Sequence, residues 1–182
     1  MPAPVVHQPP PRMLTLLRHL LSILLLPFVV TVVVPRWLLG SDAASFGWGG
    51  APAIDALSRV AGVAVFAIGF ALFAWCVMLF ARVGRGTLAP WDPTQRLVAV
   101  GPYRHVRNPM ISGVLLMLIG EALLWRSGAL ALWAGAFLVI NHTYFLLSEE
   151  PGMERRFGES YRVYRSNVPR WIPRIEPWPG EG

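Results

Sequence analysis

The stretch Met110–Leu147 decides the fold: it reads MISGVLLMLIGEALLW, then RSG at residues 126–128, then ALALWAGAFLVINHTYFLL. About 20 apolar residues in a helix cross the hydrocarbon core of a bilayer. The first run, Met110–Trp125, is short and contains Glu121, whereas the second, Ala129–Leu147, has close to the full length. We expect two membrane helices joined by a tight turn at residues 126–128.

Two more apolar runs precede this hairpin. Leu14–Pro35 carries Arg18 and His19 near its start and Pro27 at a predicted kink, and Val60–Ala81 contains no charged residue. The sequence therefore predicts an all-α integral membrane protein with about four transmembrane helices. A cleavable signal peptide is the alternative interpretation of the first run, which is longer than a typical signal core.

Composition agrees with a membrane protein and excludes several classes of enzyme. Of the 182 residues, 54% are hydrophobic and 14% are charged, against roughly 25% charged in soluble domains. All sixteen basic residues are arginine, so no lysine is available for a Schiff base or a Walker motif. Cys76 is the single cysteine and the four histidines are scattered, so we expect no disulfide framework and no metal site.

Arginine placement predicts the orientation, because cytoplasmic loops near membrane helices carry an excess of positive charge. With four membrane helices, only Arg36, Arg59 and Arg126 lie on one side of the membrane. The other thirteen are Arg12, Arg18, Arg82, Arg85, Arg96, Arg104, Arg107, Arg155, Arg156, Arg162, Arg165, Arg170 and Arg174. We therefore expect both termini in the cytoplasm. The lysine-free, alanine- and glycine-rich composition favours a bacterial inner membrane, and the net charge of +6 indicates membrane boundaries rather than a nucleic-acid partner.

The chain divides into four parts. They are a disordered proline-rich lead (1–13), two membrane helices with an outer loop (14–81), a core made of a cytoplasmic loop, the hairpin and a C-terminal helix (82–174), and a tail (175–182). Trp171 and Trp178, near the end of the chain, are expected to anchor it at the membrane interface.

Four polar residues stand directly before the third apolar run: Arg104, His105, Arg107 and Asn108. The start of a helix offers free backbone N–H groups and a positive dipole end, which suit a carboxylate or a phosphate. The alternative explanation for these arginines is that they anchor the loop on the positively charged side of the membrane. The residues alone favour this anchoring over a ligand site.

An amphipathic helix is predicted after the fourth run, because Met153, Phe157, Tyr161 and Tyr164 recur at helical spacing. It should lie at the cytoplasmic interface. The preceding pair Glu149–Glu150 opposes the basic trend and needs a cationic partner. Cations before one helix and acids after another could together hold a zwitterion such as S-adenosylmethionine. The chain has no room for the α/β domain of a soluble methyltransferase.

An ordered set of motifs then supports a family resemblance. The set comprises Gly101–Gly113 (GPYRHVRNPMISG), the apolar hairpin, Glu149–Glu150, Phe157-Gly158, Tyr161, Tyr164 and Val168–Arg170. Over about residues 84–174 the chain resembles the isoprenylcysteine carboxyl methyltransferase and phospholipid methyltransferase superfamily. The resemblance implies an integral-membrane enzyme that moves a methyl group from S-adenosylmethionine, bound on the cytoplasmic side, to a lipophilic small molecule or lipid. It makes residues 82–174 a methyltransferase core whose loop and C-terminal helix form the cofactor site.

By match to the family's motifs, the resemblance points to Arg107, Pro109, Gly113, Glu149 and Glu150 as cofactor-binding residues. The polar segment before the third run adds Tyr103, Arg104, His105 and Asn108 to this predicted set. We choose Tyr161, Tyr164 and Arg170 as the residues that position the acceptor, and anchoring at the lipid headgroups is the alternative role of Arg170. Asn108 stands where the eukaryotic enzymes carry histidine, and Ile111 where a tyrosine is usual. These two departures affect the predicted identity of the methyl acceptor more than the predicted binding of the cofactor.

Two other functions remain open from the sequence: a non-catalytic scaffold or assembly factor of the same fold, and a small transporter subunit. A transporter would show helical repeats with polar residues at mid-bilayer. Only Glu121 and the pair Asn141-His142 resemble that pattern. We expect Glu121 to pair with Arg126 or to be neutral, and His142 to form a hydrogen bond inside the bundle. The acceptor and the oligomeric state are left open.

Overall fold

The computed structural model describes residues 24–41, 47–48, 50–79, 82, 97 and 99–180. These residues form helices joined by turns, with one isolated β-bridge between Gly47 and Ser127. This confirms the all-helical prediction. The proline-rich lead, the beginning of the first apolar run and most of the loop between residues 82 and 98 lie outside the described residues.

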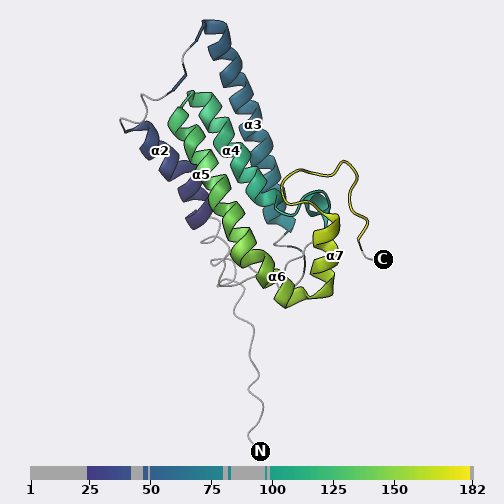
Figure 1. Cartoon of the computed structure of the whole chain (residues 1–182). Helices are drawn as coiled ribbons and strands as arrows, with labels where there is room; N and C mark the ends of the chain where they lie inside the picture. Colours follow the sequence, from purple (N-terminus) through teal and green to yellow (C-terminus); the bar gives the residue numbers. More distant parts are fainter. Residues whose placement is uncertain are drawn as a thin grey trace, which may run out of the picture.

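Four helices, α2 to α5, run side by side, and α6, α7 and the C-terminal tail gather at one end of them (Figure 1). We call this the polar end; it is the end where α3 stops and α4 begins. In chain order the elements are η1 (Leu24–Val33), α2 (Val34–Leu39), α3 (Pro52–Leu79), η4 (Gly101–Arg104), α4 (Pro109–Trp125), α5 (Gly128–Tyr144), η5 (Phe145–Glu149), α6 (Glu150–Phe157) and α7 (Glu159–Asn167).

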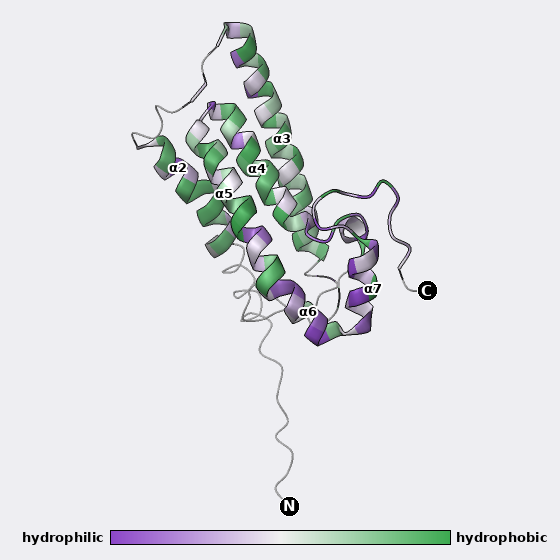
Figure 2. Ribbon diagram, in the orientation of Figure 1, coloured by the Kyte–Doolittle hydropathy of each residue, from purple (hydrophilic) through white to green (hydrophobic). Residues whose placement is uncertain are grey.

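Two helices are long and apolar enough to cross a membrane: Pro52–Leu79, and the continuous helix Gly128–Phe157, which comprises α5, η5 and α6. Leu26–Leu39 and Pro109–Trp125 are apolar but shorter. Figure 2 shows the bundle as hydrophobic along its length and α6 and α7 as hydrophilic. These helices are compatible with an all-helical membrane protein, and the four-span count stays a prediction.

Glycines bring α3 and α4 into backbone contact. A Cβ atom built on Gly62 would lie 2.8 Å from the carbonyl oxygen of Gly120, and one built on Gly69 would lie 2.6 Å from the carbonyl oxygen of Gly113. Small residues allow such close approach between membrane helices, where dispersion contacts replace the hydrophobic driving force. This packing holds α4, and with it the loop that precedes α4, in a fixed place against α3.

The predicted tight turn between α4 and α5 is confirmed. Arg126 adopts the left-handed conformation (φ 51°), and the Ser127 hydroxyl accepts a hydrogen bond from the backbone N–H of Leu130 at 3.3 Å. The expected pairing of Glu121 with Arg126 is wrong, because Arg126 forms its ion pair with Asp55 at the start of α3. Within the described ranges, Oε2 of Glu121 is buried without a hydrogen-bond partner.

The predicted single amphipathic helix is wrong in one respect. Its first part, α6, continues α5 without interruption, and the chain then reverses at Gly158, whose φ is +56°. A side chain is strained in that left-handed region, whereas glycine is not. The second part, α7, folds back and buries Tyr161, Tyr164, Val168 and Trp178 in one apolar cluster.

Candidate functional site

The polar end is organised around the carboxylate of Glu150, at the first position of α6, whose side chain is only 7% exposed. Arg170 binds it with two hydrogen bonds, from Nε to Oε1 at 2.7 Å and from Nη2 to Oε2 at 2.9 Å. Arg107 donates from Nη1 to Oε1 at 2.9 Å. Nε of Arg165 lies 3.8 Å from Oε2. Three guanidinium groups therefore surround one carboxylate.

These groups come from distant parts of the sequence. Arg107 belongs to the loop that precedes α4, Arg165 to α7, and Arg170 to the tail after α7. Glu150 directly follows η5, a stretch of wider, π-type helix, and such turns are frequent at functional sites. The ion pairs thus fasten the loop and the tail to the end of the long helix.

Glu150 is held in its charged form. The apolar run ends at Leu147, so this carboxylate lies past the apolar part of the long helix. Burial alone would raise the pKa of Glu150, but the hydrogen bond from Arg170 and the charges of Arg107, Arg170 and Arg165 outweigh burial and lower it. The hydrogen bond to Glu150 in turn raises the pKa of Arg170.

A cavity of about 60 Å³ lies beside this cluster. Seven of the twelve predicted site residues line it: Tyr103, Arg107, Asn108, Glu149, Glu150, Tyr161 and Tyr164. Its apolar lining consists of Leu97, Phe145 and Met153, which were not among the predicted site residues. Met153 was identified as a member of the amphipathic stripe, but nothing in the sequence marked Phe145, at the end of an apolar run, as different from its neighbours.

Four other predicted site residues support the loop from outside the cavity lining. Arg104 donates from Nε to the carbonyl oxygen of Trp178 at 2.5 Å, and Nδ1 of His105 lies 2.8 Å from the carbonyl oxygen of Arg174. Pro109 is buried at the start of α4, and Gly113 packs against α3. The positions of these four residues are consistent with a role in holding the loop in place. Their predicted contacts with a cofactor stay predictions.

Arg107 has an unused hydrogen-bond donor. Its Nη1 binds Glu150 and its backbone N–H donates to the carbonyl oxygen of Pro169 at 2.9 Å, but its Nε is buried with no partner among the described residues. A buried donor left unpaired is costly. The same arginine is one of the residues that line the cavity.

The two tyrosines of α7 are buried. The Tyr164 hydroxyl donates a hydrogen bond to the carbonyl oxygen of Tyr103 at 2.7 Å and so ties α7 to the loop. Burial, followed by the nearby charge of Glu150, raises the pKa of Tyr161. Burial likewise raises the pKa of Tyr164. Both phenols are therefore neutral at physiological pH and can donate hydrogen bonds.

Glu149 is the second acidic group of the cavity and, like Glu150, lies beyond the apolar run that ends at Leu147. Burial and the charge of Glu150 raise the pKa of Glu149 to about 7, and the charge of Arg156 acts in the opposite direction. The carboxyl is thus poised to lose its proton near neutral pH. A cation that entered the cavity would favour that loss.

This raised pKa predicts a dependence of stability on pH. The folded state holds the Glu149 proton more tightly than the unfolded chain, so the free energy of unfolding should fall as the pH rises from about 4.5 to about 7 and then level off. Glu149→Gln should reduce this slope. Thermal unfolding in detergent across that pH range measures the slope. Glu159→Gln is the control, because the side chain of Glu159 is 75% exposed. An unchanged slope in Glu149→Gln would contradict the assignment.

The described residues form an all-helical structure that is compatible with a membrane protein and has a cavity lined by charged residues at its polar end. Residues 57–160, more than half of the chain, match the model of the phospholipid methyltransferase family, and the chain belongs to that family. It is also similar to an uncharacterised protein of Haemophilus influenzae, with 33% identity over 60 residues, which are 32% of this chain and 94% of that protein.

Proposed function

We propose that this protein is an S-adenosylmethionine-dependent methyltransferase that acts on a lipophilic small molecule or a lipid at the membrane interface. Family membership favours a methyltransferase over a scaffold or a transporter subunit. The observation that carries the proposal is the cavity at the polar end, which is lined by both a cation, Arg107, and an acid, Glu149. In this proposal the polar end faces the cytoplasm of a bacterial inner membrane.

The residues of the cavity fit the charged end of this cofactor. The unpaired Nε of Arg107 would be satisfied by a carboxylate, and Glu149 offers an oxygen pair to an ammonium group. Asn108 can donate or accept. In this proposal the charged end of the cofactor occupies the cavity that Arg107 and Glu149 line.

The chemistry requires positioning rather than a catalytic triad. When bound, S-adenosylmethionine supplies a sulfonium methyl group that is already activated. The protein must hold the acceptor in line with that group and exclude water. Phe145 and Met153 provide apolar walls, and the neutral hydroxyl of Tyr161 can donate a hydrogen bond to an acceptor.

Arg170 would contribute both to positioning the acceptor and to binding the cofactor. It was expected to position an acidic acceptor, and its bidentate contact with Glu150 also connects it to the predicted cofactor set. An acidic group of the acceptor would therefore have to share Arg170 with Glu150. For this reason we expect Arg170→Ala to lower cofactor affinity as well as turnover.

The test of the function is transfer of a labelled methyl group. Membranes that contain the protein are incubated with methyl-labelled S-adenosylmethionine, and the lipids and small molecules that carry the label are identified by mass spectrometry. We expect label in a lipophilic product that membranes without the protein do not form. Absence of labelled product, together with no thermal shift by S-adenosylhomocysteine, would favour the non-catalytic scaffold.

Arg107→Ala should weaken the binding of S-adenosylhomocysteine by about 1.5–3 kcal/mol, since it removes a charge-assisted hydrogen bond to the ligand's carboxylate. Titration calorimetry on folded protein in detergent measures the change. Arg155→Ala is the matched control, because this arginine is exposed on α6 and its loss alters net charge equally. If both variants bind like the parent, Arg107 is not a cofactor residue.

A further inference from the structure

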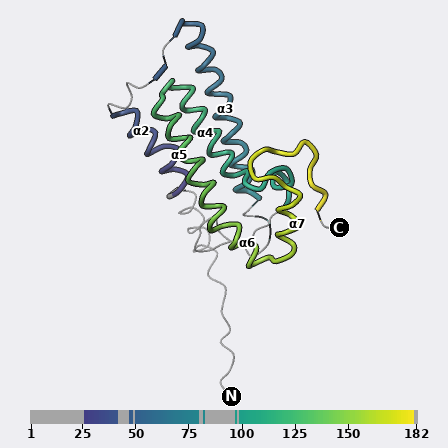
Figure 3. Tube along the Cα trace, in the orientation of Figure 1, coloured from purple at the N-terminus to yellow at the C-terminus, as the bar shows by residue number. Residues whose placement is uncertain are grey.

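The tail residues 169–178, which we call the strap, run along the loop that carries Arg107. Three backbone hydrogen bonds join them, each 2.9 Å long: from Arg107 N–H to the Pro169 carbonyl, from Arg174 N–H to the His105 carbonyl, and from Trp178 N–H to the Arg104 carbonyl. In Figure 3 the strap leaves α7 and turns back towards the bundle. The strap therefore holds the loop from outside.

The two tryptophans of the strap face the protein. Trp171 donates from its ring nitrogen to Nδ1 of His142 at 3.0 Å, and its ring centroid lies 5.7 Å from that of Phe145. Trp178 is 8% exposed and packs against Tyr164 at 5.6 Å. Both tryptophans therefore contact other parts of the protein, and their role as anchors at the membrane interface stays a prediction.

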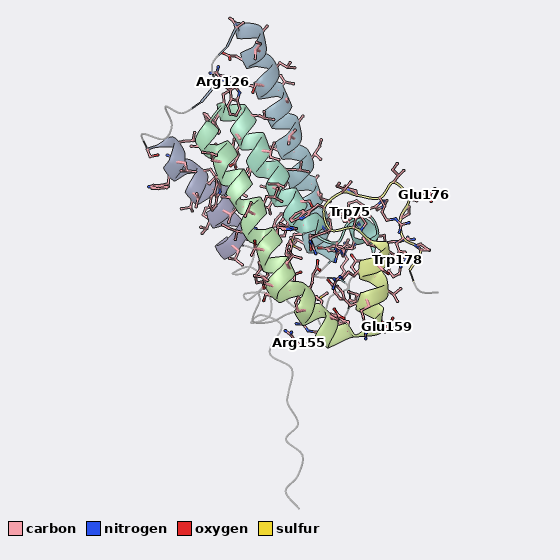
Figure 4. All side chains as sticks on the ribbon, in the orientation of Figure 1. Trp75, Arg126, Arg155, Glu159, Glu176 and Trp178 are labelled. Atoms are coloured by element: carbon pink, nitrogen blue, oxygen red, sulfur yellow. The ribbon has the colours of Figure 1, made fainter. Side chains whose placement is uncertain are left out.

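Isoleucines face outwards instead. Ile172 is 80% exposed and Ile175 is 97% exposed, which leaves two large apolar side chains of one short segment without any covering residue in the described part of the chain. Their position is close to the membrane helices, since neighbouring Trp171 contacts α5 at His142, inside the apolar run. In Figure 4, Glu176 on the strap stands about as far along the bundle as Trp75 of α3, whereas Glu159 lies further out.

We propose that the strap is a membrane-binding element, with Ile172 and Ile175 inserted among the lipid chains at the polar end of the bundle. The bilayer is the occupant that the structure favours, because exposed apolar side chains are also found where the strap meets the long helix: Leu146 and Leu147, next to Phe145, are exposed on the same helix that Trp171 contacts. Exposed Arg155 and Arg156 on α6 suit the anionic headgroups of that interface.

This arrangement couples lipid contact to the loop. Lipid holds the outer side chains of the strap, and the strap's backbone holds the residues from Arg104 to Arg107. The membrane thereby contributes to the order of the loop that carries Arg107, whichever ligand the cavity binds. The proposal thus does not depend on the methyltransferase assignment.

Site-directed spin labelling tests the proposal on the full-length protein. A nitroxide is attached at Ile172→Cys or Ile175→Cys, and the native Cys76, which is 0% exposed, does not compete for the label. Substitution at such exposed positions should leave the fold intact. The protein is placed in vesicles of phosphatidylethanolamine and phosphatidylglycerol, and the accessibility of the nitroxide to oxygen and to a nickel chelate is measured.

We expect both labels to show a ratio of oxygen to nickel accessibility several-fold higher than Glu176→Cys, the exposed polar neighbour, because oxygen concentrates in lipid and the chelate stays in water. Equal ratios at Ile175 and Glu176 would overturn the proposal and place the strap in water. Low accessibility to both reagents, combined with spin–spin coupling between labels, would overturn it in favour of a second copy of the chain.

Discussion

Glu150→Gln is expected to destabilise the protein by about 3 kcal/mol, because it leaves two guanidinium groups facing a neutral amide in a poorly solvated place. Arg107 is 11% exposed and Arg170 is 17% exposed, so neither cation can regain full hydration without moving. The value is at the lower end of the range for broken buried pairs, since Arg170 retains some contact with water. Thermal or denaturant unfolding in detergent, followed by tryptophan fluorescence, measures the loss.

Glu154→Gln is the matched control for this substitution. Glu154 lies one turn further along α6, is 40% exposed, and forms ion pairs with Arg165 at 3.5 Å and Arg162 at 3.7 Å. Exposed pairs of this kind contribute about 0–1 kcal/mol. Similar small losses in both variants would show that the Glu150 cluster is solvated and does not organise the polar end.

Local sequence patterns predicted the bundle well, because each membrane helix is a local property. Apolar runs of sufficient length mark helices in a bilayer whatever their neighbours are. The hairpin turn at Arg126 and the start of α4 at Pro109 follow equally local signals. The exact start of α3 was not predicted by a local signal. The helix begins at Pro52, eight residues before the charge-free run that defines it in the sequence.

The break in the C-terminal helix could not be found from its apolar period. Met153, Phe157 and Tyr161 keep helical spacing across Gly158, so the pattern predicts one helix. The left-handed conformation at Gly158 reverses the chain, and the same apolar residues then meet in a cluster between two helices. A glycine within a periodic run is compatible with both outcomes.

The sequence brought several residues of the polar end together but did not specify how they are connected, and their roles in a site stay predictions. Arg107 and Glu150 were expected in one site on the basis of charge complementarity, and the structure joins them at 2.9 Å. The bidentate contact between Arg170 and Glu150 depends on how the tail returns after α7, which no local pattern specifies. The same return path turns Trp171 and Trp178 inwards and leaves Ile172 and Ile175 exposed.

Gly120→Ala should destabilise the bundle by about 1–3 kcal/mol through overpacking of α4 against α3. A Cβ atom at this position would lie 2.6 Å from the backbone nitrogen of Phe66 and 2.8 Å from the carbonyl oxygen of Gly62. Backbone atoms cannot rotate away as a side chain can, so the two helices must separate. That separation would also remove the hydrogen bond from the Ser58 hydroxyl to the carbonyl of Leu123, which is 2.8 Å long.

Gly135→Ala on α5 is the control, because a Cβ atom there meets nothing within 4 Å. It adds the same methyl group to a membrane helix without a clash, and since alanine favours the helix over glycine, stability should be unchanged or higher by up to ~1 kcal/mol. Unfolding of both variants in the same detergent separates the clash from the change in helix propensity. If Gly120→Ala were as stable as Gly135→Ala, the backbone contact between α3 and α4 would not exist in the protein.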